Sequence, residues 1–144
     1  MDENKAAFIA EKTIALVGAS SQRGFGNTIF RELRKKGYRV LPLSTTADSV
    51  DGERCYRSLD ELPEPVGGVL TVVPPQVTER IVPECARLGI RRIWMQQGSE
   101  SPEAIRLCTE HGLAAVHHAC ILMYVQPTFP HSWHGWFWRL IGKY

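Results

Sequence analysis

Three features that would place the chain in large classes of protein are missing from its 144 residues. No apolar run approaches the ~20 residues that span a bilayer, so no transmembrane segment is expected. No cysteine pair has the C-x-x-C spacing of a redox or zinc motif. The 17 lysine and arginine residues barely outnumber the 15 aspartate and glutamate residues, and so small an excess of positive charge argues against a nucleic-acid partner. Hydrophobic residues at 44% and charged residues at 22% indicate an ordinary globular domain.

The four cysteines are far apart, and they are Cys55, Cys85, Cys108 and Cys120. A disulfide framework is typical of short secreted chains. The first residues, Met-Asp-Glu-Asn-Lys, have no basic segment followed by an apolar one, so no secretory signal is expected. We therefore expect reduced thiols in a cytoplasmic protein, and the chain length is that of one ordinary domain.

Apolar, β-rich runs alternate along the chain with helical patterns. The expected strands cover residues 13–17, 38–43, 69–73, 92–95 and 113–116. Helical spacing of apolar residues is found at 27–36, 77–88 and 101–111, and a glycine follows each of these segments. Strands separated by such helices are typical of right-handed βαβ units. The expected fold class is α/β: a single doubly wound, Rossmann-like domain with a five-stranded, mainly parallel sheet and helices on both faces.

The segment after the first strand combines small residues with polar ones and leads into a helix. Ligands of open α/β sheets bind outside the carboxyl ends of the strands. Small residues let the backbone approach a ligand, and the start of a helix presents N–H groups and a positive dipole. A diphosphate is therefore the expected ligand, and a plain glycine-rich turn is the alternative. The residues concerned are Gly18, Ala19, Ser20, Ser21, Gln22, Arg23 and Gly26.

This segment differs from the G-x-G-x-x-G fingerprint of dinucleotide-binding domains, because Ala19 and Ser20 follow Gly18. The acidic residue that would bind a ribose hydroxyl at the end of the second strand is also missing, and Ser44-Thr45-Thr46 occupies that place. NAD is therefore disfavoured. A regulator that binds NAD or another nucleotide remains an alternative.

Two further loops fall at expected strand ends on the same edge. Val73-Pro74-Pro75 would form a rigid apolar wall for a flat ring or an alkyl chain. Gln97 and Gly98 supply an amide and an accessible backbone at the next strand end. Alone, the prolines could simply begin a helix and Gly98 a turn. Together, at successive strand ends, these loops predict a binding site.

Several motifs occur in one collinear order over about 110 residues. They are Val17-Gly18-Ala19-Ser20, Gly24 and Gly26-Asn27, Gly37-Tyr38, Cys55-Tyr56-Arg57-Ser58-Leu59, Leu62-Pro63, Val73-Pro74-Pro75, Trp94-Met95-Gln96-Gln97-Gly98 and Cys120-Ile121. This set resembles the stand-alone CoA-binding protein family. It is also similar to the corresponding domain of the succinyl-CoA synthetase alpha subunit and of ADP-forming acyl-CoA synthetases. The resemblance implies coenzyme A or an acyl-CoA as ligand, with phosphates near residues 20–26. It also implies adenine or pantetheine contacts near Ser44, Val73, Pro74 and Gln97.

The chain departs from that family at two points. Family members often carry Asn-Pro and then Lys after the second strand, suited to the 3′-phosphate, whereas Ser44-Thr45-Thr46-Ala47 has no cation. Arg23 or another base would have to supply the charge. The synthetases also have a second domain with a phosphorylated histidine and a partner subunit, and these 144 residues contain neither. We therefore expect a non-catalytic binding module.

The alternative is an enzyme of thiol or acyl-transfer chemistry, with Cys120 as nucleophile and His117 or His118 as base. A buried cysteine at a strand end is more often a packing residue. A metal site could combine these side chains with His131 and His134. No second well-spaced ligand pair accompanies them, so no metal site is expected.

The expected CoA-binding domain covers residues 1–125, and an aromatic tail covers 126–144. Apolar residues of the tail fall at helical spacing, and they are Trp133, Trp136, Phe137, Leu140 and Ile141. A helix of about ten residues is marginal alone, so this stripe must pack against something. The alternatives are the helical layer of its own domain, a second copy in a homodimer, or a bilayer surface. Packing on protein is favoured over the bilayer.

Overall fold

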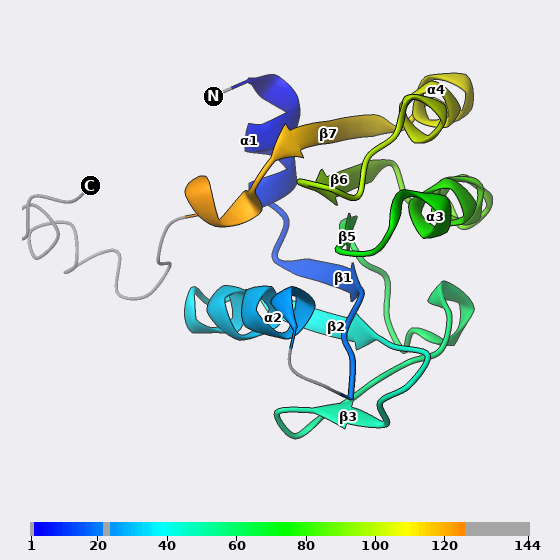
Figure 1. Cartoon of the computed structure of the whole chain (residues 1–144). Coiled ribbons are helices and arrows are strands. Elements are labelled where there is room, and N and C mark those ends of the chain that lie inside the picture. The colour runs from blue at the N-terminus through cyan, green and yellow to red at the C-terminus, as the bar shows by residue number, and fades with distance from the viewer. Residues whose placement is uncertain (1, 22–23, 126–144) are drawn as a thin grey trace, which may run out of the picture.

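A five-stranded parallel sheet forms the centre of the molecule (Figure 1). The computed structural model describes residues 2–21 and 24–125. The strands are β1 (Thr13–Val17), β2 (Arg39–Leu43), β5 (Gly68–Thr71), β6 (Arg92–Gln96) and β7 (Ala114–Ala119). Their order across the sheet is β2-β1-β5-β6-β7, and each neighbouring pair is parallel. Strands covered on both faces require continuous apolar runs, which explains the composition of the central strands.

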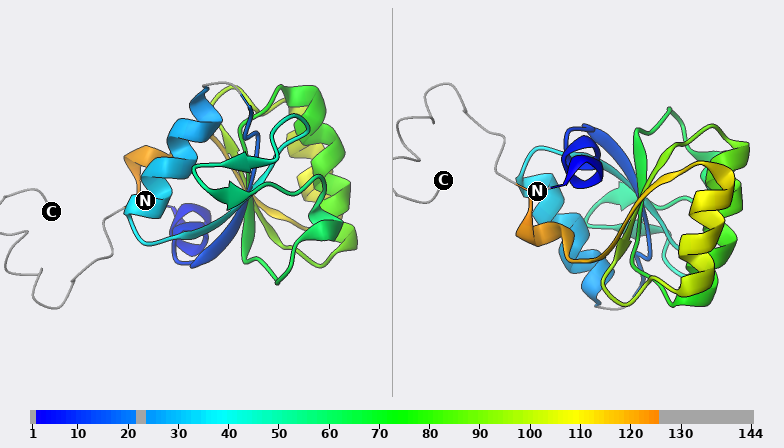
Figure 2. Two further views of the ribbon diagram at one scale, coloured as in Figure 1. Left: turned by 90° about the horizontal axis from the view of Figure 1, so that it is seen from below. Right: turned by 90° about the horizontal axis from the view of Figure 1, so that it is seen from above.

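Helices cover both faces of the sheet, as the two end views in Figure 2 show. The helices α1 (Glu3–Ile9) and α2 (Phe25–Lys35) pack on one face, and α3 (Pro75–Arg87) and α4 (Pro102–His111) pack on the other. The helix α2 packs through an apolar stripe that consists of Ile29, Phe30 and Leu33. A short 3-10 turn, η2 (Ile121–Met123), follows β7.

The connection from β2 to β5 contains no α-helix. It forms a small hairpin, β3 (Ser49–Val50) with β4 (Glu53–Arg54), and then a 3-10 turn, η1 (Leu59–Glu61). Tyr56 lies beside β2: its N–H donates to Pro42 O, and its carbonyl accepts from Ser44 N–H, both at 2.9 Å. Leu59 then joins the apolar core on the α3 and α4 face. A loop with a hairpin therefore stands where a crossover helix is usual, and it borders the site described below.

The expected fold class is confirmed: the five predicted strands form the sheet, and the three predicted helices are α2, α3 and α4. Some bounds differ, since α2 begins earlier than predicted, at Phe25, and β7 continues to Ala119. The helix α1 and the hairpin of β3 and β4 were not predicted from the sequence. Among the described residues, no helix is long and apolar enough to cross a membrane. The tail prediction for 126–144 lies outside the described residues.

Residues from outside the sheet contact the backbone of both edge strands. The strand β2 is an edge strand, which is a position that tolerates Pro42 because proline has no N–H. Tyr56 pairs with Leu43 of this strand in an isolated parallel bridge. At the opposite edge, Asn4 of α1 donates from its side-chain amide to the carbonyl of Ala115 in β7, at 3.3 Å. Backbone groups of both edge strands are thus engaged by residues outside the sheet.

Candidate functional site

The strand order reverses between β1 and β5, because β2 lies on one side of β1 and the later strands lie on the other. Such a switch point separates the loops that leave the two neighbouring strands and opens a crevice at their carboxyl ends. The loops after β1, β2 and β5 meet there. The topology thus brings together three of the segments that the sequence singled out.

An open cavity of about 780 Å³ occupies this switch point. Its volume lies within the range of small-molecule and cofactor sites. Seven of the predicted site residues line it: Gly18, Ala19, Ser20, Ser21, Ser44, Val73 and Pro74. Apolar side chains from β1, β2 and α3 form much of the wall, among them Val17, Leu43 and Val77. The side chains of the described residues leave the crevice open.

Two glycines allow the β1–α2 segment to pack closely beside the cavity. A Cβ on Gly18 would lie well within 3.0 Å of the carbonyl oxygen of Val72, and the backbone of Gly18 has φ +132°. A Cβ on Gly26 would be equally close to the carbonyl oxygen of Gly18. Only glycine therefore lets the end of β1, the adjoining strand and the start of α2 approach to this degree.

The amide groups of this segment are partly engaged within the protein. The side chain of Asn27 accepts from Ser20 N–H and donates to the carbonyl of Ser20, both at 3.0 Å. The N–H of Ser21 donates to Thr46 Oγ1 at 3.2 Å. The amides of Phe25 and Gly26, in the first turn of α2, have no acceptor within the helix. The N–H groups of Ser20 and Ser21 thus already have side-chain acceptors within the protein.

Ser44 organises the loop after β2. Its hydroxyl accepts from the N–H groups of Thr46 at 3.1 Å and Ala47 at 2.9 Å, and it is almost fully buried. This arrangement turns Thr45 and Thr46 toward the cavity, which both residues line. Ser44 thus contributes by shaping the loop.

Two arginines of the cavity were not predicted as site residues. Arg57 donates to the carbonyls of Ser44 at 2.7 Å and Ala47 at 3.0 Å and pairs with Asp48 at 2.7 Å. Arg80 lines the cavity from α3. The motif around Arg57 was visible in the sequence, but its position beside β2 depends on a crossover that periodicity cannot reveal. Arg80 lies on the polar side of a helical stripe, where a solvated arginine is the ordinary expectation.

The other predicted site residues lie away from this cavity or outside the described ranges. Gln97 and Gly98 are exposed on the turn after β6 and are not part of the cavity lining, and neither is Gly26. Ser99 from that turn accepts from Val73 N–H at 2.9 Å and so supports the wall indirectly. Gln22 and Arg23 lie outside the described residues. Their roles stay predictions.

Cys120 follows β7, two strands away from the switch point, and it does not line the cavity. The Nδ1 atoms of His117 and His118 lie 2.7 Å apart, and His118 Nε2 lies 3.8 Å from a Glu100 oxygen. Within the described ranges no hydrogen bond joins either imidazole to the thiol of Cys120. The nucleophile and base of the alternative enzyme hypothesis are therefore near in sequence without the contact that nucleophilic catalysis requires.

Two of the remaining thiols are deep in the core. Burial raises the pKa of Cys85 to about 12 and that of Cys108 to about 11, so neither forms a thiolate near neutral pH. In residues 2–21 and 24–125, no three His, Cys, Asp or Glu side chains gather as a metal site would require. His131 and His134 lie outside those ranges.

A doubly wound α/β domain with an open cavity at its switch point defines a class of proteins that bind nucleotide-like ligands. Comparison with known proteins gives the family. The chain belongs to the CoA binding domain family, whose model matches residues 12–126. The resemblance inferred from the motifs is thus confirmed.

Individual relatives agree with this assignment. The chain is 24% identical over 126 residues to the alpha subunit of the ADP-forming acetate–CoA ligase II of Pyrococcus furiosus, covering 79% of this chain and 28% of that one. A conserved hypothetical protein from Pyrococcus furiosus has a similar structure, with 36% sequence identity and a TM-score of 0.73; the match covers 78% of this chain and 97% of that one. A protein from Thermus thermophilus is 30% identical with a TM-score of 0.75, and the match covers 85% of this chain and 96% of that one. The chain spans only 12% to 28% of the curated ligases that it matches first.

Proposed function

We propose that the cavity at the switch point binds coenzyme A or an acyl-CoA, and that the chain acts as a non-catalytic binding module. The observation that carries this proposal is the open cavity of about 780 Å³ between the loops after β1, β2 and β5. Membership of the CoA binding domain family supports the choice of ligand.

Each wall of the cavity suits one part of such a ligand. Gly18, Ala19, Ser20 and Ser21, in the loop that leads from β1 toward α2, line the side that we assign to the diphosphate. The N-terminal end of α2, which follows this loop, carries a positive dipole that favours an anion. Val73, Pro74 and Val77 offer an apolar surface to the adenine ring or the pantetheine chain. The hydroxyls of Thr45 and Thr46 lie on the opposite wall and can donate to phosphate or ribose oxygens.

A binding module also fits the position of the thiols. Cys120 lies outside the cavity, and Cys85 and Cys108 are buried. The described residues that line the cavity include no cysteine and no histidine. Among the described residues, the site thus offers ligand contacts without a nucleophile and base beside them.

The proposal is tested by calorimetry of the full chain with coenzyme A, ADP and NAD. We expect coenzyme A to bind more tightly than either nucleotide. A Ser21→Glu variant places a negative charge on the loop beside the diphosphate and should weaken binding of coenzyme A at least tenfold. Ser49→Glu adds the same charge on the exposed hairpin strand β3 and serves as the matched control. Binding of NAD without binding of coenzyme A contradicts the proposal.

A further inference from the structure

The arginines of the described chain differ in how their charge is used. Most are paired with a carboxylate on the surface, and these are Arg31, Arg34, Arg39, Arg57, Arg87, Arg92 and Arg106. Arg54 stacks on the ring of Tyr56 at 5.2 Å. Within residues 2–21 and 24–125, Arg80 and Arg91 have neither a carboxylate within 4 Å nor a hydrogen-bond acceptor. Of these two arginines, only Arg80 lines the cavity.

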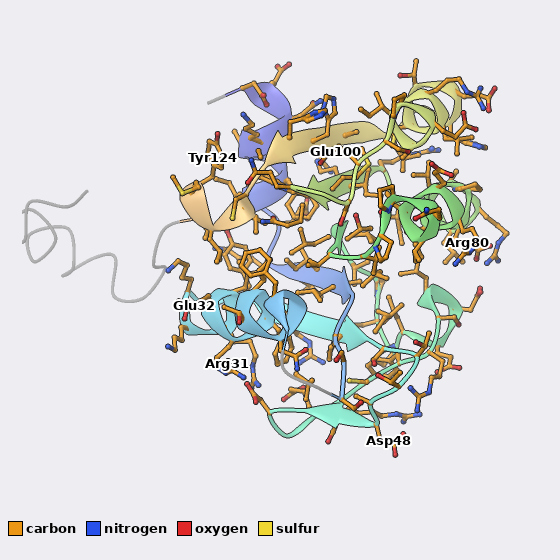
Figure 3. The ribbon with its side chains drawn as sticks, viewed as in Figure 1. Arg31, Glu32, Asp48, Arg80, Glu100 and Tyr124 are labelled. Carbon is orange, nitrogen blue, oxygen red and sulfur yellow. The ribbon has the colours of Figure 1, made fainter. Side chains whose placement is uncertain are left out.

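The position of Arg80 directs this charge toward the site. It lies on α3 between Val77 and Ile81, which both line the cavity. Figure 3 shows Arg80 leaving α3 on the side that faces the η1 segment. Residues 18–21 of the loop after β1, which we assign to the diphosphate, line another part of the cavity. A guanidinium at this point is therefore placed for an anionic group other than the diphosphate.

The other charged side chains that the structure describes in the cavity lining, Arg57 and Glu84, already form ion pairs within the protein. Arg57 uses its guanidinium on the carbonyls of Ser44 and Ala47 and on Asp48, and so holds the loop after β2 in place. The carboxylate of Glu84 pairs with Arg87, which points it along α3. Of the charged groups described around this cavity, Arg80 is the one that no protein partner neutralises.

We propose that Arg80 is the specificity-determining residue for a phosphate monoester on the ligand, such as the 3′-phosphate of coenzyme A. This inference rests on the proposed function. The loop after β2 begins with Ser44, Thr45 and Thr46 and carries no positive charge at these positions. A guanidinium presents paired N–H donors that match phosphate oxygens, and it remains charged at any physiological pH. Arg80 thus supplies from α3 the charge that the loop after β2 lacks.

The test compares coenzyme A with 3′-dephospho-coenzyme A by calorimetry on the full chain. The unsubstituted protein should bind coenzyme A about tenfold more tightly, as expected for a charge-assisted contact. Arg80→Gln should remove that difference by weakening binding of coenzyme A alone. Arg91→Gln is the matched control, because Arg91 is an exposed arginine outside the cavity. It should leave both affinities unchanged.

The outcomes separate this inference from the proposed function. If the unsubstituted protein binds both ligands equally well, or Arg80→Gln weakens both equally, the role of Arg80 is wrong although the cavity binds the coenzyme. If neither ligand binds, the proposed function itself fails. Arg80→Lys provides a further check, since an ammonium keeps the charge without the paired donors and should restore part of the discrimination.

Discussion

At the scale of single residues, the site depends on side chains that are small enough to let backbone segments meet. Gly18 and Gly26 stand at the two points where the end of β1, the neighbouring strand and the start of α2 come closest. Asn27 then fastens the segment between them through two hydrogen bonds to Ser20. The cavity wall is therefore set by packing before any ligand contact is made.

Gly26→Ala should destabilise the protein and weaken coenzyme binding. The added Cβ would press on the carbonyl of Gly18, so the start of α2 has to move, and overpacking of this kind costs about 1–3 kcal/mol. Gly24→Ser is the control, because nothing lies within 4 Å of a Cβ at Gly24 and serine is a favourable N-cap. Urea denaturation measures the effect, and equal stability of the two variants would contradict the packing argument.

The buried thiol of Cys85 should make the protein less stable at high pH. Its folded pKa is raised to about 12, so its contribution to stability is complete below the ordinary thiol pKa and is lost as the pH rises toward 12. Above the ordinary thiol pKa, the free energy of unfolding should fall by about 1.4 kcal/mol per pH unit, so the loss of stability reaches roughly 2 kcal/mol by pH 10.5. Cys85→Ala should show a shallower fall in unfolding free energy between pH 8 and pH 10.5. Val82→Ala, a buried neighbour without a titrating group, should keep the steeper fall.

At the scale of elements, the sequence predicted those strands and helices whose apolar residues recur at a regular spacing or in a continuous run. The five strands are apolar runs bounded by glycine or proline, and α2, α3 and α4 have continuous apolar stripes. The helix α1 was missed because its seven residues form only about two turns, too short for a recognisable helical periodicity, and only Phe8 is buried. The hairpin was missed because β3 and β4 have two residues each, too few for a recognisable alternation.

Phe8 should carry most of the stability that α1 contributes. Its ring is buried against Trp94, with centroids 5.6 Å apart in an edge-on arrangement, and it packs on Gly68. Phe8→Ala should lower the free energy of unfolding by about 3–5 kcal/mol. Phe25→Ala makes the same substitution at a side chain that is 51% exposed and should cost less than about 1 kcal/mol. Similar losses in both variants, measured by chemical denaturation, would show that α1 is not anchored through Phe8.

At the scale of the whole molecule, the site could be predicted only in part. The loops after β1, β2 and β5 follow from the rule for carboxyl ends of parallel strands, and Ser44, Val73 and Pro74 indeed share one cavity. Gln97 and Gly98 follow the same rule but leave the sheet from β6, one strand further from the reversal. Arg57 and Arg80 join the site through the crossover and the orientation of α3, which depend on three-dimensional packing.

Removal of residues 127–144 should change how copies of the chain associate. The apolar stripe expected in this segment, including Trp133 and Trp136, needs a protein surface to cover it. If that surface is a second copy, the truncated chain should become monomeric; if it is the chain's own domain, the truncated chain should lose solubility. Light scattering after size-exclusion chromatography distinguishes these results. A truncated chain that matches the full chain in both respects contradicts the prediction.

The residues that flank the sheet also limit how it can propagate. Tyr56 occupies a place beside β2, Pro42 lacks an N–H there, and Asn4 engages a carbonyl of β7. A strand from another molecule that approached β2 or β7 would therefore meet backbone groups that already have a hydrogen-bond partner. Growth by edge-to-edge stacking, the route by which exposed β-structure seeds fibrils, is opposed at each side.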